Sequence, residues 1–147
     1  SNKIIFYVGK LILISKLIDG TFPDYTRVIP KNNNEILYVN RLNLLSAVDR
    51  VSTIVNEKSP VIKFKLFKNL VNLSTFNSDN SSATEDIEAK FEGKEIEIGF
   101  NAKYIMDILD NLKENEIQIS FMDNSSPIIA QEKSNPNLIY VLMPMRV

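Results

Sequence analysis

One order of segments occurs twice along the chain, and this internal repeat constrains the fold more than any other feature of the sequence. In each copy a strand leads into a short amphipathic helix, and three strands follow. The two copies are offset by about 60 residues. One copy alone cannot bury both its helix and a face of its sheet. The pattern therefore predicts an α+β domain of two pseudo-symmetric β-α-β-β-β halves, with two helices packed on antiparallel sheets.

The two predicted helices carry matching start signals. Asn40 precedes a helix expected over residues 41–55, and Asn101 precedes one expected over residues 102–112. An Asn side chain in this position accepts a hydrogen bond from a backbone N–H that the helix leaves unpaired. Apolar residues at helical spacing then predict one buried face for each helix. They are Leu44, Leu45, Ala47, Val48, Val51 and Ile54 in the first helix, and Ile105, Ile108, Leu109 and Leu112 in the second.

Alternating apolar and polar residues predict the strands. The first copy has them at residues 35–39, 61–66, 70–76 and 85–91, and the second at residues 95–100, 117–122, 127–131 and 138–143. A polar loop is expected over residues 77–83, and a further strand over Tyr25–Ile29. Near the start, Ile4–Val8 and Leu11–Ser15 flank Gly9-Lys10 and predict a hairpin. A generic α+β domain without symmetry stays the alternative at this point.

The composition excludes several kinds of chemistry. The 147 residues suit one domain with a real core. There is no cysteine and no histidine, which excludes disulfides and thiolate metal sites and removes the commonest general base and metal ligand. A net charge of −1 argues against a broad basic face that grips DNA. It leaves open a protein that encloses DNA and touches it lightly.

No group of residues points to catalysis. Glu95 and Glu97 share the polar face of a strand whose other face is apolar, which predicts solvated side chains. Asp107 and Asp110 lie three apart on the second helix and are at most a weak site for a divalent ion. No glycine-rich loop precedes a helix to hold a phosphate. We therefore predict a non-enzyme without a cofactor or metal; an enzyme with an unrecognised site stays an alternative.

The apolar segments do not predict a membrane protein. The sequence has no uninterrupted run of about 18 apolar residues. Residues 4–14 are apolar enough for a signal peptide, but Gly9-Lys10 interrupts them and no small-residue cleavage site follows. We expect a cytoplasmic protein.

Two motifs near opposite ends of the chain carry a family resemblance. Residues 19–25 read Asp-Gly-Thr-Phe-Pro-Asp-Tyr, and residues 143–146 read Met-Pro-Met-Arg. Most chain ends are polar and frayed, whereas this one is apolar and rich in adaptable methionine. The pair resembles the C-terminal third of the bacterial β sliding clamp family, the processivity rings of replicative DNA polymerase. The resemblance extends over essentially the whole chain.

The resemblance implies a DNA-clamp fold and a fragment of a longer protein. Residues 1–24 would be a remnant of the clamp's second domain, its last hairpin and linker, and residues 25–147 the complete third domain. The whole protein would be a homodimeric sliding ring around duplex DNA that recruits polymerase, clamp loader and repair polymerases through a short linear peptide. It would have no chemistry of its own. A stand-alone peptide-binding α+β module without a DNA role is the alternative.

The resemblance also implies three sets of site residues. The partner-peptide pocket comprises Pro23, Arg27, Val28, Asn101, Tyr104, Val141, Met143, Pro144, Met145 and Arg146. The DNA-facing candidates are Arg50 and Lys103, followed by Arg41 and Lys113. The ring-interface candidates are Thr53, Ile54, Glu85 and Asp86. For the pocket the chemistry is suitable, because aliphatic side chains form a socket, a tyrosine adds a flat ring, and an arginine can bind a carbonyl or an acid. For the helices, a mixed solvated face stays equally open.

Overall fold

The computed structural model describes residues 2–55, 60–76 and 81–147. Its strands are β1 (Lys3–Val8), β2 (Leu11–Lys16), β3 (Glu35–Asn40), β4 (Val61–Phe67), β5 (Leu70–Phe76), β6 (Ser82–Lys90), β7 (Ile96–Asn101), β8 (Glu116–Phe121), β9 (Ile128–Gln131) and β10 (Ile139–Leu142). Its helices are α1 (Arg41–Ser52), α2 (Ala102–Asn111) and the short 3-10 helix η1 (Tyr25–Arg27). The predicted repeat is confirmed as β3-α1-β4-β5-β6 followed by β7-α2-β8-β9-β10.

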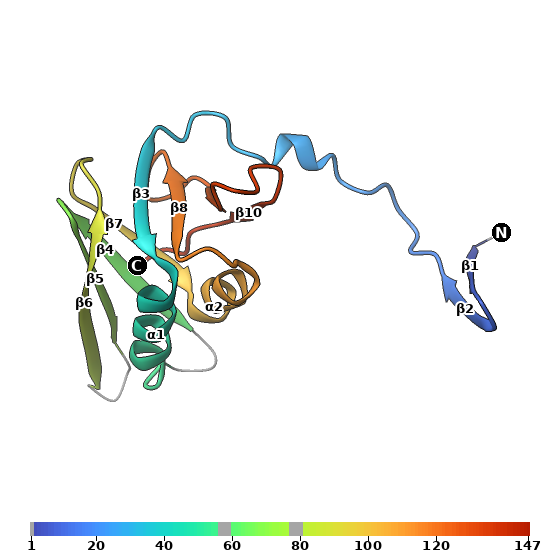
Figure 1. Ribbon diagram of the computed structural model, residues 1–147, viewed down its shortest axis with the longest axis horizontal. Coiled ribbons are helices and arrows are strands. Elements are labelled where there is room, and N and C mark those ends of the chain that lie inside the picture. Colours follow the sequence, from blue (N-terminus) through green and yellow to red (C-terminus); the bar gives the residue numbers. More distant parts are fainter. Residues whose placement is uncertain (1, 56–59, 77–80) are drawn as a thin grey trace.

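The two halves exchange their first strands. The eight-stranded antiparallel sheet has the order β10-β9-β8-β3-β6-β5-β4-β7. Thus β3 of the first half pairs with β8 of the second, and β7 of the second pairs with β4 of the first. The strands β3 and β6 meet at Tyr38–Lys90 and Val39–Ala89, which joins the two four-stranded parts. The helices α1 and α2 lie side by side and pack against this sheet (Figure 1).

Both predicted helix caps are confirmed. The side chain of Asn40 accepts a hydrogen bond from the Asn43 N–H at 3.0 Å. The side chain of Asn101 accepts one from the Lys103 N–H, also at 3.0 Å. Each cap satisfies an N–H group that the first helical turn cannot pair internally. The two helices therefore start at equivalent places in the two halves.

The backbone around the two caps also matches. The Arg41 N–H donates to the Asn115 carbonyl, and the Ala102 N–H donates to the Pro60 carbonyl, both at 2.8 Å. Asn115 directly precedes β8, and Pro60 directly precedes β4. Each helix is thus tied at its first residue to the strand that pairs with the strand before it. This is the pseudo-two-fold relation that the repeat predicts.

A single apolar core joins the two halves. Phe64 of β4 meets Phe100 of β7 edge to face, with the ring centroids 5.1 Å apart. Phe91, which follows β6, packs on Phe121 of β8 at 5.8 Å. Both contacts connect a residue of one half to a residue of the other. Because each half completes the other's core, neither is expected to be stable alone.

The strand expected over Tyr25–Ile29 is wrong. Residues Tyr25–Arg27 form the 3-10 helix η1 instead. The side chain of Asp24 accepts a hydrogen bond from the Thr26 N–H at 3.1 Å and caps this turn. A short polar side chain that bonds to its own local backbone competes with strand pairing.

Two further boundaries differ by three residues from the expected ones, and the others differ by less. The helix α1 ends at Ser52 rather than at residue 55. The hydroxyl groups of Ser52 and Thr53 donate to the carbonyls of Asp49 and Arg50 at 2.8 Å each, which satisfies carbonyls of the last turn locally. The strand β6 begins at Ser82, inside the expected polar loop. Residues 77–80 of that loop lie outside the described residues.

The hairpin β1–β2 stands at the end of an extended segment, away from the eight-stranded sheet (Figure 1). Gly9 adopts a φ of 59° at its turn, a conformation that glycine reaches without steric cost. Apolar side chains such as Tyr7, Val8 and Leu11 are exposed on it. Among the described residues, no helix is long and apolar enough to cross a membrane.

Candidate partner-peptide site

The last five residues, Met143–Val147 (the tail), bridge back to the edge of the sheet. The strand β10 ends at Leu142, and the chain continues beyond it. The Met145 N–H donates to the Gly99 carbonyl of β7 at 2.8 Å and makes an isolated antiparallel bridge. The tail is therefore held by backbone pairing with β7, whereas the preceding strand pairs with β9.

The first turn of α2 lies directly after this bridge. Asn101 follows Gly99 by two residues, and its side chain also accepts from the Tyr104 N–H at 3.4 Å. The side chain of Tyr104 is 54% exposed. The cap fixes the backbone from which Tyr104 projects, so the ring is displayed at the helix start. The Met145–Gly99 bridge thus brings the tail next to the turn that carries Tyr104.

The predicted pocket residues fall on three segments. The structure brings together the segment of Asn101 and Tyr104 and the segment of β10 and the tail, through the bridge to β7. The third segment is η1 with its flanking residues, where Arg27 Nε lies 3.3 Å from a carboxylate oxygen of Asp24 and Val28 is half exposed. Among the described residues, no hydrogen bond or ion pair joins Pro23, Arg27 or Val28 to the other two segments.

Sequence reasoning missed Gly99. A Cβ atom there would lie 2.4 Å from Cγ1 of Val147 and 2.6 Å from the Met145 carbonyl oxygen. Its φ is not in the left-handed region, so the need for glycine comes from space and not from backbone conformation. A glycine inside a predicted strand was the available signal, because such a position often marks a close backbone approach.

Two of the DNA-facing candidates are engaged within the domain. Arg41 donates through Nη1 to the Leu109 carbonyl at 3.0 Å and through Nε to the Glu114 carbonyl at 3.2 Å. Arg50 donates through Nε to Oε2 of Glu85 at 2.9 Å and forms a second, parallel contact with Oε1. This pairing raises the pKa of Arg50 and lowers the pKa of Glu85. Arg41 therefore joins the two helices, and Arg50 joins α1 to β6.

The other two DNA-facing candidates, Lys103 and Lys113, are exposed at opposite ends of α2. The Lys113 backbone N–H donates to the buried carboxylate of Glu132, while the Glu114 N–H donates to the same oxygen at 2.6 Å. Only the backbone of Lys113 is held by these bonds. Both lysines keep a surface position in which their ammonium groups can meet an anion.

The ring-interface candidates surround a partly unpaired strand edge. Glu85 and Asp86 lie in β6, which pairs with β5 over residues 82–88 and with β3 only at Ala89 and Lys90. Asp86 accepts from the Asn72 side-chain amide at 2.6 Å. Thr53 is the C-cap residue of α1 and is exposed. An unpaired strand edge can pair with a second chain.

The comparison with protein-family models decides the identity of the fold. Residues 26–146 match the model described as the DNA polymerase III beta subunit, C-terminal domain. The chain belongs to this family. The predicted resemblance and the predicted clamp fold are both confirmed.

Relatives and solved structures agree with this membership. The chain is 39% identical over 146 residues to the beta sliding clamp of Caulobacter vibrioides, which covers 99% of the chain and 39% of that protein. It is 35% identical to the beta sliding clamp of Escherichia coli, over 100% of the chain and 40% of that protein. A crystal structure of a sliding clamp from Bartonella birtlesii bound to griselimycin superposes with a TM-score of 0.93 at 41% identity, over 99% of this chain and 40% of that one. The chain thus spans about two fifths of these relatives.

The carboxylates of Glu95, directly before β7, and of Glu97, within β7, are solvated, as predicted. Glu97 lies 3.2 Å from Nζ of Lys63, and Glu95 lies 2.8 Å from Nζ of Lys65. The hydrogen bond from Lys63 is the main cause that lowers the pKa of Glu97. In the part of the chain that the structure describes, no three acidic residues gather to hold a metal ion. Glu95 and Glu97 therefore serve as partners of surface lysines.

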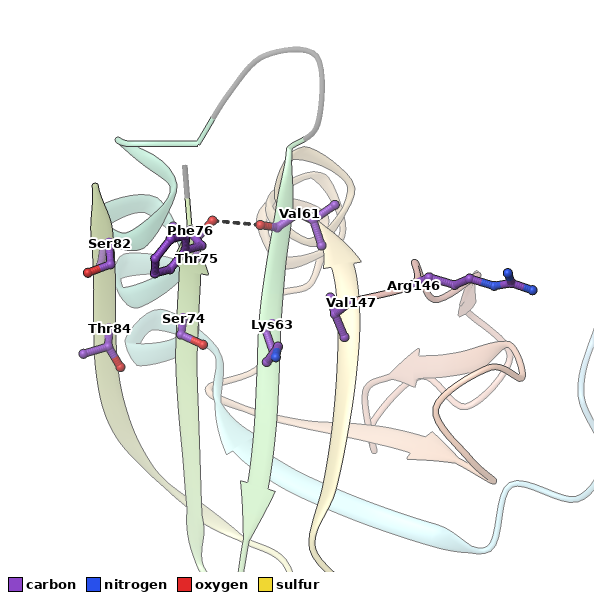
Figure 2. Close-up of a pocket in the computed structure, with 10 residues that line it drawn as sticks. Val61, Lys63, Ser74, Thr75, Phe76, Ser82, Thr84, Arg146 and Val147 are labelled. Atoms are coloured by element: carbon purple, nitrogen blue, oxygen red, sulfur yellow. Dashed lines mark hydrogen bonds between the residues drawn. The ribbon is translucent and has the colours of Figure 1, made fainter. Parts of the chain in front are cut away.

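A hollow of about 440 Å³ lies on the outer face of β4, β5 and β6 (Figure 2). The tail contributes Arg146 and Val147 to its rim, and the hydroxyl of Thr75 donates to the Val61 carbonyl at 2.9 Å beneath it. Figure 2 shows Val147 beside β7, whereas Arg146 extends away from the strands. The hollow shares the end of the tail with the candidate peptide site but not Tyr104 or Asn101.

Proposed function

We propose that this chain is the partner-recruiting C-terminal part of a sliding ring that tethers a replicative polymerase to duplex DNA. The observation that carries the proposal is the Met145–Gly99 bridge, which sets the tail beside the first turn of α2. Met143 and Tyr104 are both more than half exposed there, and Arg146 is exposed at the rim. An adaptable apolar side chain, a flat ring and a cation suit a short peptide that has apolar residues and a carboxyl end.

In this proposal, residues 1–24 are a hairpin and the linker of a preceding domain, and residues 25–147 form the clamp domain that follows it. The exposed apolar side chains of β1 and β2 support this division. A two-stranded hairpin is marginally stable alone and needs further strands or a packing surface. The greater length of the relatives leaves room for such strands.

The ring and the DNA belong to the same proposal. The unpaired edge of β6, together with Thr53 and Ile54, would meet the first domain of a second copy in a head-to-tail homodimer. Arg50 and Lys103, with Arg41 and Lys113, would face the DNA. Few cations on these helices suit sliding, because each neutralised phosphate adds salt-sensitive, sequence-independent affinity. The ring would recruit polymerase, clamp loader and repair polymerases in the cytoplasm and carry out no chemistry.

A titration tests the partner site. A peptide that ends in Leu-Phe is titrated calorimetrically into the wild-type chain, into Met143→Ala and into Met122→Ala. Met122 is a matched control, because it is exposed and follows β8 outside the candidate site. We expect Met143→Ala to weaken binding by roughly tenfold and Met122→Ala to leave it unchanged. Equal effects of the two substitutions would place the site elsewhere.

A second titration compares the chain with the full-length protein. The candidate pocket would take its other wall from the preceding domain, so the chain should bind the peptide more weakly by about 1–3 kcal/mol. Equal affinity would mean that the chain already contains the whole site, as a stand-alone peptide-binding module would.

DNA retention tests the ring. At moderate salt the chain alone should show negligible affinity in a gel-shift assay, because its helices carry few cations and it cannot enclose the duplex. The full-length protein loaded on circular DNA should stay bound and should leave once the circle is cut. Tight, saturable binding by the chain alone would contradict topological tethering.

A further inference from the structure

We propose that Gly99 is a positioning residue for the partner-peptide site, because only a residue without a side chain lets the tail lie across β7. The inference rests on the proposed function of the tail. Gly99 itself would not touch the peptide. It would set where Met143 and Arg146 stand relative to the first turn of α2.

The location of Gly99 allows it to influence both the tail and the first turn of α2. It lies in β7, the outermost strand at one end of the sheet, and pairs with Lys63 of β4 on its inner side. Its other side is the edge on which Met145 makes its bridge. Two residues later the chain reaches Asn101, the cap of α2. The same short segment of β7 therefore holds the tail and starts the helix that presents Tyr104.

The space above Gly99 is occupied by the tail itself. A Cβ atom at this position would meet Cγ1 of Val147 at 2.4 Å, the Met145 carbonyl oxygen at 2.6 Å and the Met145 carbonyl carbon at 3.4 Å. Two of these three atoms are backbone, so rotation of a side chain cannot relieve the conflict. A methyl group here would push the backbone of the tail off the strand.

The orientation of Arg146 follows from the same arrangement. Successive side chains of an extended segment point to opposite sides. Val147 lies beside β7, and Arg146 extends in another direction, away from the strands (Figure 2). If the tail leaves Gly99, the direction of Arg146 is no longer set by the sheet. Peptide binding would therefore be weakened because Arg146 is no longer oriented, although all chemical groups of the site remain present.

Apart from its conflict with the tail, the substitution Gly99→Ala is expected to stabilise the strand. Alanine in a strand normally stabilises relative to glycine, because glycine loses more conformational freedom on folding. Gly99→Ala should therefore harm the domain only through its conflict with the tail. A chain that ends at Leu142 lacks the tail and removes that conflict, so it is the matched background for the same substitution.

The test compares wild type and Gly99→Ala in the complete 147-residue chain and in the chain that ends at Leu142. Hydrogen exchange of the Met145 amide, which is bonded to Gly99, reports tail position without any peptide. In the complete chain we expect Gly99→Ala to expose this amide and to weaken binding of the Leu-Phe peptide by at least about tenfold. In the shortened chain the substitution should leave the melting temperature unchanged or raise it.

Several outcomes would overturn the inference. Unchanged peptide affinity in Gly99→Ala would do so, whether or not the Met145 amide is exposed. An equal drop in melting temperature, or a failure to fold, in both backgrounds would show that the conflict is not with the tail. A wild-type chain that binds no peptide would refute the proposed function and the role of Gly99 in it. The amide measurement would still report separately whether Gly99 holds the tail.

Discussion

The first turns of α1 and α2 have the same backbone design but carry different side chains. Each follows a strand that ends in Asn, and each is capped by that Asn. In α1 the first residue is Arg41, whose guanidinium donates to the carbonyl of Leu109 in the last turn of α2 and to that of Glu114 just after the helix. In α2 the first turn displays Tyr104 to solvent beside the tail. One half of the repeat therefore uses this place for internal cohesion and the other for a candidate binding site.

The helix ends differ as well. After α1, the hydroxyl groups of Ser52 and Thr53 satisfy the last carbonyls. After α2, the buried carboxylate of Glu132 accepts the N–H groups of Lys113 and Glu114, and the carboxylate of Glu114 accepts those of residues 133 and 134 at 3.0 Å. The pseudo-two-fold relation thus extends to strand pairing and to helix starts. The side chains at equivalent positions make different interactions in the two halves.

The largest effect is expected from removing the tail, which follows the last strand of the second half. Deletion of residues 143–147 should reduce peptide binding by at least about a hundredfold while the fold survives, because the paired part of β10 ends at Leu142. Circular dichroism checks the fold, and calorimetry checks binding. A truncated protein that folds and still binds at wild-type strength would show that the tail is only structural.

The next comparison is between two arginines of α1. Arg41→Ala should lower the free energy of unfolding by about 2 kcal/mol, because it leaves two partly buried carbonyls without their charged donor. Arg50→Ala should have a smaller effect, since the Arg50 side chain is 60% exposed in its ion pair with Glu85. Urea denaturation of both variants measures the difference. A larger loss for Arg50→Ala would contradict the assigned role of Arg41.

Substitution of the two cap residues compares the first turns of α1 and α2 most directly. Asn40→Ala and Asn101→Ala should each cost about 1 kcal/mol of stability. Asn101→Ala should in addition weaken peptide binding several-fold, since the same cap holds the backbone of Tyr104. Thermal melts and peptide titrations of both variants separate the two effects. Equal peptide affinities would mean that the first turn of α2 does not serve the site.

The smallest expected effect is a pH dependence at the end of α2. The hydrogen bonds from Ser134 and Lys133 lower the pKa of Glu114 below its ordinary value of about 4.3. A lowered pKa stabilises the fold above the unfolded-state value, and this contribution is lost as the pH falls through the folded-state value. Glu114→Gln should therefore flatten the stability profile below about pH 4.3. Chemical denaturation of the wild-type chain and of Glu114→Gln at several pH values above and below this point measures the two slopes, and equal slopes would contradict the assigned role of Glu114.

Much of the fold could be predicted because its signals are local. Asn40 and Asn101, the apolar spacing of the helices and the alternation within the strands each act over a few neighbouring residues. These signals correctly predicted both helices and the succession of strands along the chain in the two halves. The strand predicted over Tyr25–Ile29 was wrong, because the side chain of Asp24 accepts a hydrogen bond from the adjacent backbone and favours a turn.

The sequence by itself determined the repeat, the two caps, the solvated carboxylates of Glu95 and Glu97, and the family motifs near both ends. Tertiary structure decided the exchange of β3 and β7 between the halves, the use of Arg41 as a link between helices, and the space above Gly99 that the tail fills. The physical reason is distance along the chain. Helical and strand periodicity depend on neighbouring residues, whereas the approach of residue 99 to residue 145 is set by packing of the whole core.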